Sequence, residues 1–391
     1  MKKSLWNVLR LPFPLGLRKR RLITAMAFAL TKHELADVKY LAKLHKVGFS
    51  EDGFGARICS EARWPQLNLG VEDEKLASFV SRVNTKVADA AKLDAFRSFR
   101  GGALDAIVKL VAPNIEGLEE QKRAATLQLF AQESFHILLI GDPGTGKTEI
   151  LRSMERLAPH AVFGLGSGTS KAGLIGSYDG NEWIPGLLVQ ANEGHALIDE
   201  LNLLKKEDRA GLYSAMEKGF VTYDKKGKHK RFDAQVKILA TANPKTDRFV
   251  GQDVKFLRTQ LPFDQALLTR FHLVYLVRKP SMKELKLITR RIISGGVREL
   301  EDSDARFVKE YVAYAEKLNV QFPDKFESMI VDFIEGLKRE EGNFLVEVGP
   351  RTVLGVIRIA KAHARARLAR HVSKVDLEVA MKLIRRSLEV V

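Results

Sequence analysis

The sequence predicts an α/β fold, in which a three-layer domain built on a central sheet is followed by a small all-α domain. Two observations support this prediction. Between about Ala112 and Val277, short apolar runs bounded by glycines alternate with helical patterns, which is typical of strands that alternate with helices. From Ser281 to Val391 the pattern is helical, with breaks at glycine and proline. We therefore divide the chain into three predicted domains, at residues 1–100, 101–280 and 281–391.

Residues 1–100 are basic, and their pattern defines no fold. Residues 1–50 carry eleven Lys or Arg against two Asp or Glu, a net +9, which is more than half of the formal charge of +16. Such an excess favours a polyanionic partner, nucleic acid first, although an uneven surface charge without a partner is the alternative. Helical patterns cover residues 32–46 and 71–97.

Two features of this region bear on the cellular setting. The apolar run Leu22–Leu30 is too short to span a bilayer, so we expect no membrane association. The single cysteine, Cys59, excludes intrachain disulfides and a multi-cysteine zinc site. A lone cysteine also fits a reducing compartment, and we expect a cytoplasmic or nucleoid-associated protein.

Five apolar runs in the second domain are the predicted strands. They are short apolar runs that alternate with helical patterns. They are His136–Ile140, Ala161–Gly164, Ala196–Ile198, Val236–Thr241 and Leu273–Leu276.

The stretch FHILLIGDPGTGKTEILRSM combines an apolar strand, a glycine-rich loop and the start of a helix. Its middle matches G-x-x-x-x-G-K-[ST], in the strand-to-helix setting that a phosphate-binding loop requires. Glycines let backbone N–H groups turn toward phosphate oxygens, Lys147 would reach the β- and γ-phosphates, and Thr148 would ligate Mg²⁺. A chance glycine-rich turn is the alternative. We predict ATP and Mg²⁺ as cofactors, with ATP held by Gly141, Asp142, Pro143, Gly144, Thr145, Gly146, Lys147 and Thr148.

Two later strands end in polar residues that ATP hydrolysis would need. HALIDELN places Asp199 and Glu200 after an apolar strand, as a Mg²⁺ ligand and as the group that polarises the attacking water. In ILATANPK, Asn243 follows the end of another apolar strand. If that strand lies between the strand of the phosphate loop and the strand of Asp199, Asn243 would help to place the attacking water. Adjacent acids at a loop start, and an Asn that forms a turn before Pro244, are the alternatives.

These elements, in this order, resemble the AAA+ ATPases and, more narrowly, the minichromosome maintenance (MCM) helicases. The resemblance runs from about Val111 to Leu388. GDPGTGKTEILR resembles the phosphate loop of the family, with Gly146 and Thr148 where the family usually has Ala and Ser. The stretch from GLGSGTSKAG to YSAMEKG is similar to the part of MCM proteins that holds an insertion in the second helix, which generic AAA+ chaperones lack.

Two arginines take their expected roles from this resemblance. LLTRFHLVYLV resembles the SRF motif of the family and makes Arg270 the arginine finger, with Thr269 in place of Ser and His272 in place of Asp. GPRTVLGVIRIAK is similar to the lid of the family and puts Arg351 at the sensor 2 position. The resemblance implies that both act on ATP bound by a neighbouring subunit of a homo-oligomeric ring, which we expect to be a hexamer. A surface salt bridge is the alternative for each arginine.

Residues 219–242 are predicted to form a strand, a basic tip and a return strand, RFDAQVKILATA. In MCM proteins the position that matches Asn243 is called sensor 1, and a hairpin just before its strand points a lysine into the central channel. An ungapped count back from Asn243 places Lys225 at that lysine. The resemblance therefore implies DNA as a partner, and lysines suit this task because they bind phosphate without reading bases. A solvated turn is the alternative. The expected DNA-binding residues are Lys225, Lys226, Lys228, Lys230 and Arg231.

Two further segments receive broader assignments. Thr169–Trp183 is expected to form another channel-facing or regulatory element. Basic residues of the helix Arg358–Arg370 could add a second DNA-binding surface, but we interpret them as mainly solvated, which is the usual state of charges on an exposed helix.

Taken together, the resemblance predicts an ATP-hydrolysing DNA translocase or helicase in a compact form, without the zinc-bearing N-terminal domain and the C-terminal winged helix of complete MCM proteins. Other replication proteins are further expected partners. Two alternatives stay open. One is a MoxR- or chelatase-like ATPase that remodels protein complexes, and the other is an accessory MCM-like ATPase that assembles without unwinding DNA.

Overall fold

The computed structural model describes residues 49–52, 55–58, 92–225, 228–246, 248–280, 282–295 and 299–389. The chain forms two compact units, residues 1–101 and 102–391. In the first unit β1 (Phe49–Asp52) pairs with β2 (Gly55–Ile58) in antiparallel fashion, and residues 92–99 are helical. The helical pattern predicted at 32–46, most of the one at 71–97, and Cys59 lie outside the described residues.

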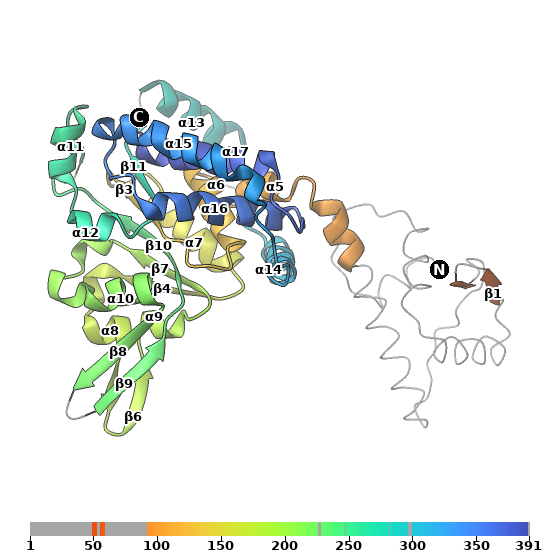
Figure 1. Ribbon diagram of the computed structural model, residues 1–391, viewed down its shortest axis with the longest axis horizontal. Coiled ribbons are helices and arrows are strands. Elements are labelled where there is room, and N and C mark those ends of the chain that lie inside the picture. Colours follow the sequence, from red (N-terminus) through yellow and green to blue (C-terminus); the bar gives the residue numbers. More distant parts are fainter. Residues whose placement is uncertain are drawn as a thin grey trace. The chain divides into compact units, whose positions relative to one another are not determined.

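The second unit is built on a parallel sheet of five strands in the order β11-β3-β10-β7-β4 (Figure 1). Each strand overlaps one of the predicted strands, which confirms the predicted α/β class. Because the strands are parallel, their carboxyl ends share one edge of the sheet and their amino ends share the other. The strands are β3 (Ile137–Gly141), β4 (Ala161–Leu165), β7 (His195–Asp199), β10 (Lys237–Ala242) and β11 (Leu273–Val277).

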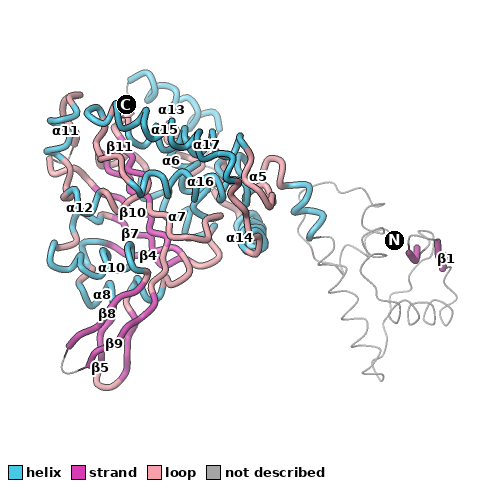
Figure 2. Tube along the Cα trace, in the orientation of Figure 1, coloured by secondary structure: helices cyan, strands magenta, loops and turns pink. Residues whose placement is uncertain are grey.

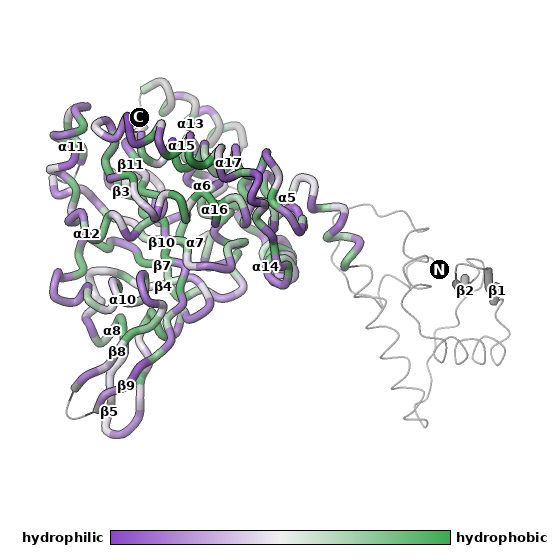
Figure 3. The backbone as a smooth tube through the Cα atoms, in the orientation of Figure 1, coloured by the Kyte–Doolittle hydropathy of each residue, from purple (hydrophilic) through white to green (hydrophobic). Residues whose placement is uncertain are grey.

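Helices bury both faces of this sheet. Every residue of β3, β7 and β10 is buried, as expected for parallel strands with helices on both sides. α7 (Lys147–Leu157) packs on β4, β7 and β10, and α6 (Glu119–Leu129), which α5 (Ala103–Val108) contacts, packs on β3. Figure 3 shows the resulting hydrophobic colours along the central strands.

A helical domain follows β11, as predicted. α16 and α17 pack along each other, and the Tyr311 hydroxyl of α14 donates to the Ala366 carbonyl at 2.6 Å. Pro350 occupies the first turn of α16, and Ser373 with Asp376 forms a capping box at the start of α17. The helices are α13 (Met282–Gly295), α14 (Asp302–Glu316), α15 (Glu327–Arg339), α16 (Pro350–Ala366) and α17 (Lys374–Leu388).

The basic residues of α16 hold the helix in place, which corrects the interpretation of this helix as mainly solvated. Arg358 Nε donates to the Glu133 carboxylate at 3.1 Å. Arg365 is 2% exposed and donates to the Gln132 side chain at 2.7 Å. These bonds tie α16 to the loop between α6 and β3, so these arginines are not available as a second DNA-binding surface.

Two antiparallel hairpins extend together from the α/β domain, at the lower end of Figure 2. The first is β5 (Gly176–Asp179) with β6 (Glu182–Pro185), flanked by α8 (Lys171–Ile175) and α9 (Leu187–Gln190). The second is β8 (Phe220–Lys225) with β9 (Lys228–Asp233), preceded by α10 (Ala210–Lys218).

The predicted single return strand was wrong. β9 ends at Asp233 and β10 begins at Lys237 in a different sheet, because the Ala234 N–H donates to the Gly219 carbonyl at 2.8 Å and closes the hairpin base. Between β10 and β11 lie α11 (Val254–Gln260) and α12 (Gln265–Leu268). Within the described part of the chain, no helix combines the length and the apolar character needed to cross a bilayer.

Candidate functional site

The loop between β3 and α7 has the backbone of a phosphate cradle. Gly144 and Gly146 have φ of 76° and 86°, a region that disfavours side chains. A Cβ at Gly146 would also lie 2.7 Å from the Ile115 side chain, so this loop accommodates glycine more easily than a larger residue. The loop thus directs its N–H groups and the amino end of α7 toward one point, which is the geometry for binding phosphate.

Lys147 lies inside this loop with its ammonium facing the loop backbone. Its Nζ donates to the carbonyls of Gly141 and Asp142, both at 2.7 Å, and the side chain is buried. Burial lowers the pKa of Lys147 to about 8, although the charges of Asp142, Asp199 and Glu200 oppose the shift. The loop therefore holds a cation whose charge is only partly stabilised by the protein itself.

Thr148 and Asp199 meet across the sheet edge, as the motifs predicted. The Thr148 hydroxyl donates to Asp199 Oδ2 at 3.0 Å. Thr241, at the end of β10, was not predicted, yet its hydroxyl donates to Asp199 and accepts the Glu200 N–H at 2.9 Å. The feature that identifies Thr241 is the pairing of β10 with β7. Ala240 pairs with Ile198, so Thr241 and Asp199 are the next residues of two parallel neighbours. Glu200 follows with φ of 54°.

This donor set fits a magnesium ion. Oxygen ligands from one carboxylate and one hydroxyl, beside a phosphate loop, are what Mg²⁺ takes from protein when nucleotide phosphates and water supply the rest. No three His, Cys, Asp or Glu side chains gather into a metal cage in the described part of the chain.

Asn243 lies at the same edge, on the strand that the motif reasoning required. β10 is hydrogen-bonded to both β3 and β7, so the residue that follows it lies between the strand ends that carry the phosphate loop and Asp199. The Asn243 N–H donates to Asn202 Oδ1 at 2.9 Å, which fixes this turn. Asn202 was not predicted, because its partner is 41 residues away.

Asp142 has a supporting position within the loop. Its carboxylate accepts the Phe249 N–H at 2.8 Å and the Lys279 N–H at 3.2 Å. The side chain thus fastens the phosphate loop to the segments that follow β10 and β11, and the Asp142 carbonyl receives the Lys147 ammonium.

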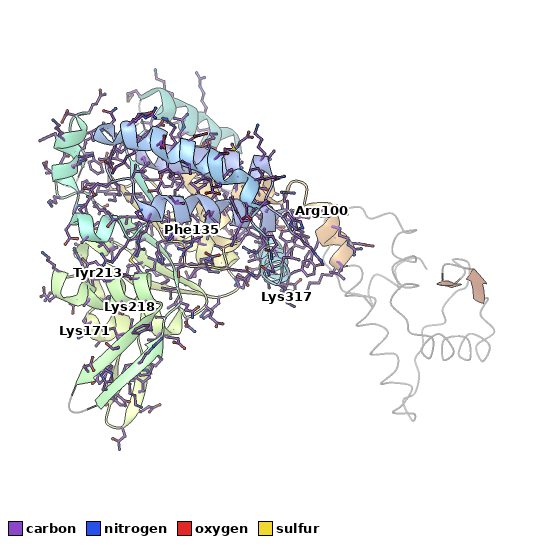
Figure 4. All side chains as sticks on the ribbon, viewed as in Figure 1. Arg100, Phe135, Lys171, Tyr213, Lys218 and Lys317 are labelled. Carbon is purple, nitrogen blue, oxygen red and sulfur yellow. The ribbon has the colours of Figure 1, made fainter. Side chains whose placement is uncertain are left out.

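Arg270 and Arg351 lie together, away from the phosphate loop. Arg270 precedes β11 at the amino edge of the sheet, and Arg351 Nη1 donates to its carbonyl at 3.1 Å. Arg270 Nη2 donates to Glu217 Oε2 at 2.9 Å. The Arg270 guanidinium carbon lies 4.8 Å from the centroid of the Tyr213 ring, which Figure 4 labels on α10. Burial, and then the charge of Arg270, lower the pKa of Arg351.

Four aromatic side chains join the two hairpins. Trp183 of β6 stacks on Phe232 of β9, with ring centroids 4.2 Å apart and planes within 6°. Tyr178 and Tyr223 meet Trp183 edge to face, each at 5.2 Å. We call Tyr178, Trp183, Tyr223 and Phe232 the aromatic cluster. Each hairpin contributes two of the four rings, so the aromatic cluster packs the two hairpins against each other.

The predicted DNA-binding residues lie on the second hairpin or at its tip. Lys225 ends β8 and pairs in register with Lys228 of β9. Lys226 lies outside the described residues. The Lys230 ammonium lies 5.5 Å from the Tyr178 ring centroid, and Arg231 is 3.7 Å from that of Phe220. Both Lys230 and Arg231 are exposed.

Two family models match the chain, the MCM P-loop domain over residues 91–294 and the MCM AAA-lid domain over residues 306–388. This chain belongs to the MCM family. The first match covers the phosphate loop, both hairpins and Arg270, and the second covers α14 to α17 with Arg351.

The MCM chain is also similar to curated relatives. It shares 30% identity over 308 residues with the minichromosome maintenance protein MCM of Saccharolobus solfataricus, which is 73% of the chain and 45% of that protein. Identity to the DNA replication licensing factor MCM4 of Drosophila melanogaster is 28%, over 73% of the chain and 36% of the relative. Identity to the DNA replication licensing factor MCM3 of Entamoeba histolytica is 28%, over 72% of the chain and 58% of the relative. The match thus spans less than two thirds of each relative.

One departure from the usual MCM pattern has a structural role here. His272 follows the finger motif where an Asp is usual, and it is buried. Its Nδ1 accepts the His136 N–H at 3.0 Å, and its Nε2 lies 2.7 Å from Arg358 Nη1. Burial, with the nearby His136 and arginine charges, keeps the pKa of His272 well below its usual value. The neutral ring thus accepts the His136 N–H through Nδ1 and packs against Arg358 of α16.

Proposed function

We propose that this MCM chain is the ATPase of a DNA translocase or helicase, which hydrolyses ATP between neighbouring subunits of a ring, a hexamer by family resemblance. The observation that carries this proposal is the placement of its charged groups. The phosphate loop, Asp199 and Asn243 share the carboxyl edge of the sheet, whereas Arg270 and Arg351 share the amino edge.

The two groups are too far apart to serve one ATP molecule within a subunit. β11 pairs Leu273 with Ile137 and Val277 with Gly141, so the phosphate loop begins where β11 ends and Arg270 lies before β11 begins. The four residue steps from Leu273 to Val277 alone separate these levels by roughly 13 Å at about 3.3 Å per step. An arginine finger acts by contact with the γ-phosphoryl oxygens, so Arg270 would serve the ATP of a neighbour.

Each residue at the carboxyl edge has a separate task in this proposal. Lys147 binds the β- and γ-phosphates, and Asn243 helps to hold the attacking water. Glu200 orients and polarises that water. Thr148 and Asp199 would hold Mg²⁺, which neutralises charge on the phosphates when it is bound.

The hairpin pair is the proposed DNA-gripping element. β9 leads through three residues into β10, and Asn243 follows β10 at its far end. A change at the γ-phosphate could therefore pass along one strand to the hairpin base. Lys225, Lys228, Lys230 and Arg231 supply positive charge for a phosphate backbone. Two of the relatives are named DNA replication licensing factors, which agrees with DNA as the partner.

Lys225→Ala tests the DNA contact. We expect DNA to stimulate ATP hydrolysis by the wild-type chain, and we expect the variant to lose that stimulation while its rate without DNA is unchanged, since Lys225 is remote from the phosphate loop. The assay measures phosphate release with and without single-stranded DNA. Equal stimulation of variant and wild type would favour an ATPase that acts on a protein partner.

Strand displacement on a forked duplex separates a helicase from an accessory subunit. We expect displacement with ATP and none by Glu200→Gln, which keeps nucleotide binding but loses the group that polarises water. Hydrolysis without displacement by the wild type would indicate the accessory role.

A further inference from the structure

The contacts around Arg270 include a carboxylate that the sequence motifs do not reveal. Glu217 accepts from Arg270 Nη2 at 2.9 Å, and Arg270 Nη1 donates to the carbonyl of Ala266. The guanidinium also lies over the ring of Tyr213. Tyr213 and Glu217 are four residues apart on α10, so one helix face presents both to the arginine. The side chain is thus held on three sides.

We propose that Glu217 is the positioning residue for Arg270 in hydrolysis of the ATP of a neighbouring subunit. The inference rests on the proposed function. Arg270 lies in the turn between α12 and β11, and a long arginine side chain loses rotamer freedom when it is ordered. A finger that is ordered before it meets the phosphate loses less freedom in the transition state, and it acts faster for that reason.

Charge supports the same role. Arg351 lies against the Arg270 carbonyl, so two cations share this edge of the sheet. Among the ion pairs of the described residues, Glu217 is the carboxylate that Arg270 contacts. The hydrogen bond from Arg270, and then its charge, lower the pKa of Glu217, so the carboxylate is ionised at neutral pH. Glu217 thereby offsets the mutual repulsion of the two arginines.

The position of Glu217 also joins the finger to the DNA-gripping hairpin. α10 ends at Lys218, Gly219 turns the chain with φ of 69°, and β8 starts at Phe220. The Ser214 hydroxyl donates to the Phe220 carbonyl at 2.7 Å and ties the helix to the strand. A displacement of the hairpin base therefore moves Glu217, and with it Arg270.

The test compares Glu217→Ala, Glu217→Gln and Arg270→Ala with the wild type in steady-state hydrolysis and nucleotide binding. We expect Glu217→Ala to lower kcat roughly 10- to 100-fold, the cost of a misplaced catalytic group, and to leave the Kd for ATP within about twofold. Glu217→Gln keeps an acceptor oxygen without the charge and should be intermediate. Glu335→Ala is the matched control, since Glu335 is an exposed carboxylate paired with Arg339 at 3.5 Å on α15.

The double variant Glu217→Ala/Arg270→Ala decides between positioning and an unrelated role. If Glu217 acts by positioning Arg270, the kcat of the double variant is no lower than that of Arg270→Ala, because the side chain that Glu217 holds is already absent. Additive losses would overturn the inference, as would a kcat for Glu217→Ala within about twofold of wild type while Arg270→Ala is inactive. If Arg270→Ala itself keeps the wild-type rate, the proposed function fails rather than the role of Glu217 alone. Thermal unfolding of all variants identifies any loss of fold. If Glu217→Ala is unfolded, the kcat of Glu217→Gln is compared with that of the wild type instead.

Discussion

At the residue scale, the phosphate loop combines a buried lysine with few compensating charges. The Lys147 ammonium is bonded to two backbone carbonyls, and burial brings its pKa to about 8. Bound phosphates would supply the missing negative charge and raise that pKa. The loop therefore favours the protonated lysine most strongly when nucleotide is present.

This coupling predicts that ATP affinity depends on pH above neutrality. The free site loses the Lys147 proton as pH rises through about 8, so binding at higher pH must take up a proton. We expect the Kd for ATP to increase between pH 7.5 and 9, by up to about tenfold per pH unit above the pKa of the free site. Terminal phosphates, with a second pKa of about 6, are already ionised in this range.

Titration calorimetry in two buffers of different ionisation enthalpy measures this proton uptake directly. A Kd that is the same at both pH values, without proton uptake, would show that Lys147 stays charged in the free loop.

The residues that could be singled out from the sequence are those that belong to a local motif. Lys147, Thr148 and Asp199 each follow a strand in a motif of fixed spacing, and the structure brings Thr148 and Asp199 to 3.0 Å. Thr241 and Glu217 were missed for a physical reason. Their contacts with Asp199 and Arg270 span 42 and 53 residues, and spacing along the chain does not encode such contacts.

At the element scale, the two hairpins are united by stacking of side chains rather than by a shared sheet. β5–β6 and β8–β9 are separate two-stranded sheets, and an isolated pair of strands is marginally stable. The aromatic cluster supplies the missing packing, since each aromatic pair adds about 0.5–1.5 kcal/mol beyond the area that it buries. The sequence analysis predicted a hairpin for the second segment only, and it did not predict the contact between the two, because a sequence does not show which aromatic residues of separate strands pack together.

Trp183→Ala tests whether the union matters for function. We expect this variant to keep its rate of hydrolysis without DNA and to lose most of the stimulation by DNA, because the β8–β9 hairpin would no longer be braced by β5–β6. Trp183→Phe should keep most of the stimulation, since a smaller ring can still stack on Phe232. Phosphate release at saturating DNA is the measurement.

Ile184→Ala is the control for Trp183, because Ile184 is the next residue of β6 and is 50% exposed. If Trp183→Ala responds to DNA as strongly as Ile184→Ala, the hairpins work independently of each other.

At the scale of the whole molecule, the parallel sheet separates the two halves of the proposed catalytic site. The sequence predicted the order of elements and the class of fold, because short apolar strands alternate with helices. It could not place the arginines at the opposite edge by pattern alone. That placement follows from the pairing of β11 with β3, which sets Arg270 before the start of a strand whose end reaches the phosphate loop.

A heterologous interface is the consequence of this separation. The carboxyl edge of one subunit would meet the amino edge of the next, and repetition of that contact closes a ring or continues as a filament. Each competent site would then need Lys147 from one chain and Arg270 from another. Loss of either residue should abolish hydrolysis, because a well-placed arginine finger contributes about 10³ to 10⁵ in rate.

The central claim is tested most directly by mixing two inactive variants. Lys147→Ala lacks the phosphate-binding lysine and Arg270→Ala lacks the finger, so neither hydrolyses ATP alone. In an equal mixture that reassembles at random, roughly one interface in four joins an intact phosphate loop to an intact finger. We predict that the mixture recovers about a quarter of the wild-type rate of phosphate release. A mixture that remains as inactive as its components would show that both residues act within one subunit and would contradict this account.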